Sequence, residues 1–133
     1  MIAHIEAMKA KLAAHGVTAY YVDAPDSPEY PYVILWGPIW GADSEPITVD
    51  DGSFDTPLYV TVVAITPDMV SPLAALVRSV LKGPLQGVPG RSAHLFYQRP
   101  AQSIQMDRKV TVPDTNRNPA FAVERYELVS TPA

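Results

Sequence analysis

Histidines and clustered aspartates are the side chains of this sequence whose types could bind a metal ion or transfer a proton. His4 and His15 are eleven residues apart in a stretch with helical spacing of apolar residues. A helix would place them about 16 Å apart, too far to share a metal ion. We therefore expect both to be solvated helix residues. His94 is isolated in an apolar run, where a histidine is more often a hydrogen-bonded packing residue than a base.

The run VDDGSFD, residues 49–55, groups Asp50, Asp51 and Asp55 around a glycine, as calcium-binding loops do. Such a loop needs a bidentate glutamate at its twelfth position, which counting from Asp50 is Thr61. An acid–base pair would need one desolvated carboxylate, whereas these lie among Gly and Ser. The chain also has no cysteine, serine elbow, zinc-binding histidine pair, phosphate loop or dinucleotide fingerprint. We expect no catalytic residue, no metal and no cofactor.

Length and composition indicate one globular domain. A chain of 133 residues can bury a sizeable core, and 47% apolar with 18% charged residues is typical of folded proteins. No apolar run approaches the ~20 residues of a membrane-spanning helix, and Glu6, Lys9 and Lys11 interrupt any secretory signal. We therefore predict a single domain over residues 1–133, made in the cytoplasm and without a membrane partner.

The formal net charge of −4 is distributed unevenly. Residues 1–70 hold ten acidic and two basic residues, a net of −8, whereas residues 71–133 hold eight basic and four acidic residues, a net of +4. If the two halves form separate surfaces, an acidic patch of one copy can contact a basic patch of the next, and such contacts close into a ring when the rotation allows. The alternative is that the halves interleave and the charges mix.

Apolar spacing and turn residues predict two helices and several strands. The helices are expected at 2–15 and within 71–83, and the strands at 18–23, 32–36, 58–66, 92–98 and 121–130, with a candidate strand at 108–112. This order indicates an α+β fold, with a single mostly antiparallel β-sheet and two helices packed on one face. We expect a long loop or arm at about residues 37–56.

The second helix has the clearest local signals. Ser71 is suited to cap it, Pro72 to occupy its first position, and Gly83 to end it. The residues expected to form its apolar stripe are Leu73, Leu76, Val77, Val80 and Leu81. In the last strand the alternation changes phase near Glu124 and Arg125, which indicates a bulge there.

The strand expected at 58–66 has apolar residues on both faces. Because side chains alternate along a strand, Tyr59 and Val63 face opposite to Val60 and Val62. Two helices can cover one face, so the other must meet a second layer or another molecule. The residues expected beside this uncovered face as interface anchors are Trp36, Ile39 and Trp40. The alternative is that the C-terminal strands fold over and bury both faces within the chain.

Arginines of the C-terminal half are the expected partners of acidic residues across a subunit boundary. The residues predicted for this role are Arg91, Arg99 and Arg108. With Phe96 and Tyr97 among them, they could instead belong to a basic face for single-stranded nucleic acid, completed by Lys109, Arg117 and Arg125. The overall acidity of the chain argues against that second interpretation.

An opening helix ending in HGV is followed by a short strand, a Pro-rich acidic loop, PYVILWG at 31–37, a long loop, PLYVTVVAI at 57–65, SPLAALVRSVLKGPL at 71–85 and ERYELVST at 124–131. In this order the elements resemble the tail terminator proteins, also called tail completion proteins, of long-tailed double-stranded-DNA phages. The resemblance covers nearly the whole chain and consists of patterns of elements rather than a set of catalytic residues.

The resemblance implies a non-enzymatic virion protein of the tail, assembled in the host cytoplasm. Members of this family form a ring, commonly a hexamer, on the head-proximal end of the tail tube, where the ring ends tube polymerisation and binds the neck proteins of the head. DNA would pass through the ring without specific binding, and an acidic lumen would repel its phosphates. The residues expected to face that lumen are Asp43, Glu45, Asp50, Asp51 and Asp55.

Other interpretations fit the same sequence. The acidic loop could project onto the tube surface instead of the lumen. The chain could be another neck component, such as a head-closure or connector subunit. From a different class, it could be a small-molecule-binding or enzymatic α+β domain with a pocket under the 37–56 loop.

Overall fold

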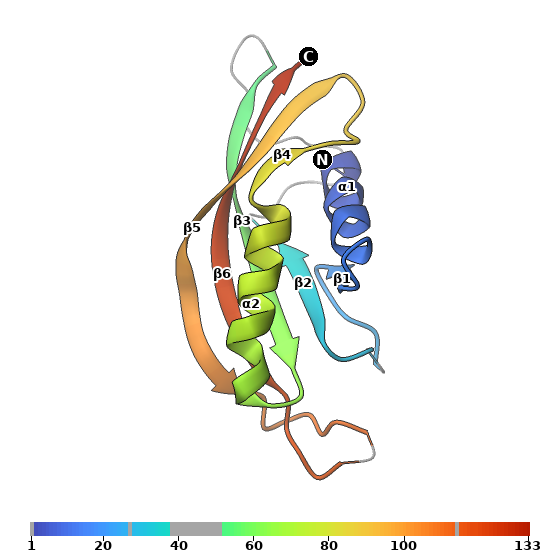
Figure 1. Cartoon of the computed structure of the whole chain (residues 1–133), viewed down its shortest axis with the longest axis vertical. Coiled ribbons are helices and arrows are strands. Elements are labelled where there is room, and N and C mark those ends of the chain that lie inside the picture. The colour runs from blue at the N-terminus through green and yellow to red at the C-terminus, as the bar shows by residue number, and fades with distance from the viewer. Residues whose placement is uncertain (1, 27, 38–51, 114) are drawn as a thin grey trace.

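The computed structural model describes residues 2–26, 28–37, 52–113 and 115–133 (Figure 1). Its elements, in chain order, are α1 (Ile2–Ala13), β1 (Thr18–Tyr21), β2 (Tyr32–Trp36), β3 (Phe54–Ala64), α2 (Pro67–Leu81), β4 (Gly83–Leu85), β5 (Arg91–Met106) and β6 (Ala120–Pro132). The strands form one sheet in the order β1-β2-β3-β6-β5-β4. Neighbouring strands are antiparallel except β1 and β2, which are parallel.

Both helices lie on the same side of the sheet (Figure 1). We call this side the core face and the opposite side the open face. The predicted α+β architecture, a single mostly antiparallel sheet with two helices on one face, is therefore confirmed. Along β3 every second residue is buried on the core face: Phe54, Thr56, Leu58, Val60, Val62 and Ala64. From α1, Ile5, Met8 and Leu12 pack against them and are at most 1% exposed. Each such side chain contributes about 1.5–3 kcal/mol by leaving water.

Helix α2 begins earlier than its sequence signals predicted. It starts at Pro67, with Thr66 as the residue before it, so the predicted start at Ser71 and Pro72 is wrong and Pro72 lies inside the helix. The reason is that Thr66 and Pro67 offer the same pattern of an extended residue followed by proline one turn and a half earlier. The predicted apolar stripe is also incorrect at Leu76, which is 41% exposed.

Strand β6 is regular, which corrects the predicted bulge. Its pairing with β3 runs without interruption from Phe54 opposite Ser130 to Ala64 opposite Ala120. The irregularities lie in the pairing with β5, between Tyr97 and Gln105. The first of them, between Tyr97 and Arg99, is opposite Arg125, so the predicted position has a bulge, but its extra residue is on β5 and not on β6. The apolar–polar alternation of the sequence is interrupted at Glu124 because this charged residue occupies a position on the core face, where it is 5% exposed.

Several other predicted boundaries differ from the structure. The strands predicted at 18–23 and 58–66 are β1 at Thr18–Tyr21 and β3 at Phe54–Ala64. Strand β5 is 16 residues long and runs to Met106, well beyond the expected end at residue 98. The candidate strand at 108–112 is not a strand, because the chain turns at Asp107–Lys109. The predicted loop at 37–56 is too long by three residues at its C-terminal end, since 54–56 belong to β3.

Candidate interaction surface

A row of aromatic and polar side chains crosses the open face. It consists of Trp36 on β2, Tyr59 on β3, Arg125 and Glu127 on β6, and Gln98 on β5, and we call it the open-face row. Strand register brings these residues together, because Trp36 pairs with Tyr59 and Tyr59 pairs with Arg125. The row thus joins residues from four adjacent strands.

The aromatic end of the row is well ordered by its own contacts. The rings of Trp36 and Tyr59 stack with centroids 4.6 Å apart and planes 20° apart. The indole N–H of Trp36 donates to Thr61 Oγ1 over 2.8 Å. A stacked pair contributes about 0.5–1.5 kcal/mol beyond the area that it buries. Trp36 is therefore held against Tyr59 on the open face, where it is half-buried.

The polar end of the row is a hydrogen-bonded chain. Arg125 donates through Nε to Gln98 Oε1 over 2.6 Å, and Gln98 Nε2 donates to Glu127 Oε2 over 3.1 Å. Arg125 also donates through Nη1 to the Tyr59 hydroxyl over 3.4 Å. These contacts fix the arginine against the Tyr59 ring, with the guanidinium carbon 5.8 Å from its centroid.

At the polar end of the row, the Glu127 carboxyl group lies close to that of Asp55. Burial, followed by a hydrogen bond and the charge of Asp55, raises the pKa of Glu127 to about 7. Asp55 and Glu127 share the open face because Asp55 pairs with Val129, two residues along β6. A carboxyl group whose pKa is near 7 is partly protonated at physiological pH. The charge of Glu127 therefore depends on pH in the physiological range.

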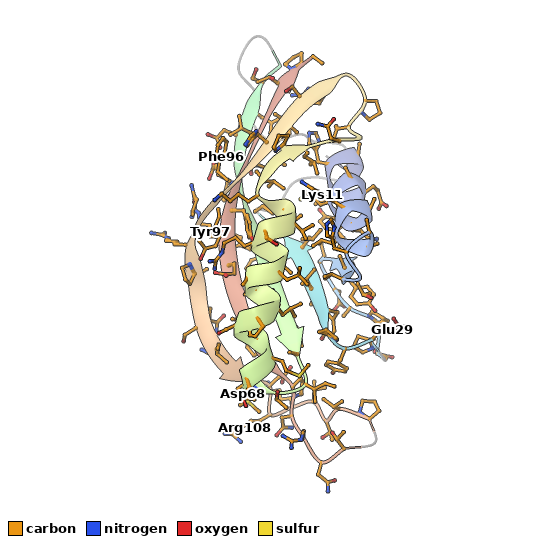
Figure 2. All side chains as sticks on the ribbon, viewed as in Figure 1. Lys11, Glu29, Asp68, Phe96, Tyr97 and Arg108 are labelled. Carbon is orange, nitrogen blue, oxygen red and sulfur yellow. The ribbon has the colours of Figure 1, made fainter. Side chains whose placement is uncertain are left out.

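Burial is uneven across the open face. At the end formed by Tyr32, Val63 and Val123 the side chains are at most 9% exposed, so that part is already covered within the chain. At the other end Phe96 is 49% exposed and stacks on His94 with centroids 4.6 Å apart. Figure 2 shows Phe96 and Tyr97 at the side of the sheet formed by β5. The sequence prediction of a face left partly uncovered by the helices is confirmed for this second end.

The three predicted interface arginines have different surroundings. Arg99 is exposed on β5 and pairs in register with Arg125. Arg108 is exposed in the turn that follows β5. Arg91 turns toward the core face instead, where it donates through Nε to Ser130 Oγ over 2.6 Å and through Nη2 to the Gly52 carbonyl over 2.7 Å. Its guanidinium is thus held by its own chain.

Several predicted site residues lie outside the described residues: Ile39, Trp40, Asp43, Glu45, Asp50 and Asp51. The remaining acidic residue of that group, Asp55, is exposed on β3. The greater part of the loop over the alternative small-molecule pocket also lies outside the described part of the chain. Among the predicted anchors, Trp36 is the one that the structure places, and it lies on the open face as expected.

The core face holds an ion pair that sequence analysis missed, formed by a buried carboxylate and a partly exposed guanidinium. Arg78 on α2 donates through Nη2 to Glu124 Oε1 over 2.7 Å, and the Tyr97 hydroxyl donates to Glu124 Oε2 over 2.8 Å. The hydrogen bond to Glu124 raises the pKa of Arg78, while burial and the same carboxylate raise the pKa of Tyr97. The guanidinium lies 3.9 Å from the Tyr97 ring centre. Both oxygens of the carboxylate are therefore satisfied.

The ion pair lies at one side of a groove between α2 and the second half of β5. The groove has a volume of about 660 Å³, and small or apolar side chains line much of it. These are Ala74, Ala75, Pro100, Ile104 and Ala122. Of them, Ile104 is 43% exposed.

The histidines do not form a metal site. His4 is buried, which corrects the expectation of a solvated residue: it is 2% exposed, lies 2.9 Å through Nε2 from Ser130 Oγ, and packs edge-on against Phe54. His15 is exposed as expected. Among the described residues no group of three or more His, Asp or Glu side chains could hold a metal ion.

Comparisons with models of known protein families and with curated proteins found no match for this chain. Within the described ranges, no helix is long and apolar enough to cross a membrane. The arrangement of side chains is therefore the basis for any functional conclusion. It offers a partly uncovered aromatic and polar sheet face, an apolar groove beside the Arg78–Glu124 ion pair, and a glutamate, Glu127, whose pKa is raised to about 7.

Proposed function

We propose that this protein is a structural virion protein that forms a ring, a hexamer, on the head-proximal end of a phage tail tube. The ring ends polymerisation of the tube and joins the tail to the neck proteins of the head. It acts by binding and has no catalytic role. The proposal combines the resemblance of the element order to tail terminator proteins with the surface described above.

The observation that carries the proposal is the open-face row, whose aromatic side chains are half-buried in this chain. Trp36 and Tyr59 are fixed by stacking and hydrogen bonding, so little side-chain entropy is lost when a partner covers them. Aromatic residues and arginine are the types enriched where protein interfaces are anchored. A sheet that has helices on one face and this row on the other is suited to packing against an identical neighbour.

Charge supports the same function. In this proposal the acidic residues from Asp43 to Asp51, together with Asp55 at the start of β3, face the lumen, where negative charge keeps DNA from adhering as it passes. The exposed arginines Arg99 and Arg108 lie on the other half of the chain and are available to acidic residues of a neighbour.

Tail assembly in the presence and absence of the protein tests the proposal. We expect electron microscopy to show overlong tubes without the protein, and tubes of uniform length that carry a ring at one end after it is added back. Tubes of the same length under both conditions would contradict the proposal. Tails of normal length that fail to join heads would indicate another neck component instead.

Light scattering after size exclusion separates a ring protein from a small-molecule-binding domain. A ring protein forms a hexamer, or a monomer that associates as its concentration rises or when tubes are added. A strict monomer that ignores tubes and is stabilised thermally by a metabolite would favour the binding domain.

A further inference from the structure

Glu127 is an acidic residue in the middle of the open face. On β6 it lies between Pro57 of β3 and Phe96 of β5, which are its partners in register. Its side chain is 19% exposed, so its own chain shields most of it from water. A carboxylate in such a place keeps its charge only if a cation or several hydrogen-bond donors compensate for the lost water.

The donors around Glu127 compensate its charge incompletely. Gln98 donates through Nε2 to Glu127 Oε2 over 3.1 Å, but this donor is an uncharged amide. Arg125 approaches the same oxygen through Nη2 only to 3.9 Å, which is beyond hydrogen-bond distance. Its Nε donates to Gln98 Oε1 over 2.6 Å and its Nη1 to the Tyr59 hydroxyl over 3.4 Å. The nearest cation is therefore oriented toward two other side chains.

A second carboxyl group lies beside Glu127. Asp55 on β3 pairs with Val129 of β6, and because side chains alternate along a strand it is on the same face of the sheet as Glu127. A side-chain hydrogen bond joins Asp55 and Glu127. Ionised carboxylates are acceptors only, so this hydrogen bond requires a proton on one of the two groups. We call Asp55 and Glu127 the carboxyl pair.

Other titratable side chains of the open face do not neutralise the carboxyl pair. On β5 these are His94 and the exposed Arg99, and on β3 the phenol of Tyr59. Within the described residues, none of the three makes a hydrogen bond or an ion pair with Asp55 or Glu127. Burial, followed by the contact with Asp55, accordingly raises the pKa of Glu127 to about 7.

We propose that association of two copies through the open face takes up a proton from solvent at the carboxyl pair, so that pH regulates ring formation. When a second copy covers this face, it removes the remaining water from Glu127, and loss of water disfavours the charged form. The ring therefore holds the singly protonated pair more tightly than the free chain does. The inference rests on the proposed ring function and on the open face as its contact surface.

The direction of the effect follows from the linkage between protonation and association. Well below about pH 7, Glu127 is already protonated in the free chain, so association takes up no proton and its affinity is constant. Above about pH 7 the free chain must first bind a proton, and the association constant falls by up to tenfold per pH unit for each contact. If the neighbouring copy instead supplied a cation to Glu127, association would release a proton and strengthen as pH rises.

Sedimentation equilibrium between about pH 6 and about pH 9, at one ionic strength, tests the inference. We expect a constant affinity at the acid end and a loss on the order of tenfold or more between about pH 7 and about pH 9. For a chain that associates only on tail tubes, cosedimentation with tubes over the same range gives the same measurement. Affinity that is independent of pH, affinity that rises with pH, or no association under either condition would overturn the inference.

Glu127→Gln isolates the carboxyl pair, because glutamine has the shape of the protonated acid and can donate to Asp55. This variant should associate at about pH 9 as tightly as the unchanged chain does at about pH 6. The matched control is Glu29→Gln, which changes an exposed glutamate outside the sheet, and His94→Gln removes the histidine of the open face. Both should keep the full pH dependence. Loss of the dependence in His94→Gln, or its persistence in Glu127→Gln, would overturn the inference.

Calorimetry counts the protons without any substitution. Association at about pH 7.5 in phosphate and in Tris buffer, whose ionisation enthalpies differ, gives the number of protons taken up from the difference in heat. We expect roughly half a proton or more per contact for the unchanged chain and none for Glu127→Gln. Equal heats in the two buffers for the unchanged chain would overturn the inference.

Tail assembly separates this inference from the proposed function. Association without proton uptake, together with overlong tubes in the absence of the protein, would overturn the inference and leave the ring function standing. Proton-linked association, together with tubes of normal length in the absence of the protein, would support the inference and contradict the proposed function.

Discussion

Replacing Arg78 by methionine removes the cation that pairs with the Glu124 carboxylate on the core face. The Glu124 side chain is 6% exposed and the Arg78 side chain 39% exposed. Breaking a fully buried pair costs about 3–5 kcal/mol, because it leaves an uncompensated charge. Since solvent reaches Arg78, we expect a smaller cost of about 2–3 kcal/mol, which for a chain of this length lowers the unfolding midpoint by roughly 6–15 °C.

Thermal and urea unfolding followed by circular dichroism measure this cost. The matched control is Lys9→Met, which breaks an exposed pair with Glu6 at 3.8 Å and should cost less than about 0.5 kcal/mol. The double variant Arg78→Met with Glu124→Leu should recover most of the loss, because no buried charge remains. Arg78→Met that costs no more than Lys9→Met would refute the reasoning.

The raised pKa of Glu127 predicts a pH dependence. The folded state binds this proton more tightly than the unfolded state, so the free energy of unfolding should fall as pH rises from 4.5 through about 7, by roughly 1–2 kcal/mol after solvent screening. Glu127→Gln should remove this fall in urea titrations; an unchanged slope would contradict the assignment. Pro72→Ala should restore a backbone hydrogen bond to Asp68 inside α2 and raise the free energy of unfolding by about 1–2 kcal/mol; a destabilised variant would show that the helix needs proline there. Trp36→Ala should cost the isolated chain about 1–3 kcal/mol for its stacking and hydrogen bond while abolishing association; collapse of the isolated fold would assign Trp36 to the core.

Local sequence patterns were sufficient to predict the bounds of β2 and the two faces of β3, because both depend on residues that are close in the sequence. The run YVILW predicted β2 with the bounds that the structure has. The alternation along β3 correctly assigned Tyr59 and Val60 to opposite faces. With Trp36 on the preceding strand, these assignments predicted the aromatic half of the open-face row.

Contacts between distant parts of the chain explain what the sequence did not reveal. Glu124 is buried because Arg78, 46 residues away in the sequence, binds it from α2. The sequence does not reveal this contact, so the charged residue within an apolar face of the strand was interpreted as a sign of a bulge. His4 is buried beside Ser130, 126 residues away. Gln98 and Glu127 join the open-face row through cross-strand register, which no local spacing encodes.

Hydroxyl-radical footprinting of Trp36 and Tyr59, in the free chain and in assembled tails, tests most directly the claim that identical copies cover the open face. In the free chain both rings are half-buried, so solvent still reaches them and we expect oxidation of both residues. In assembled tails, when the protein is present in a ring, we expect both to be strongly protected while Leu76 and Met69, exposed on α2, keep their reactivity. Equal oxidation of Trp36 and Tyr59 in the free and assembled forms would contradict the account.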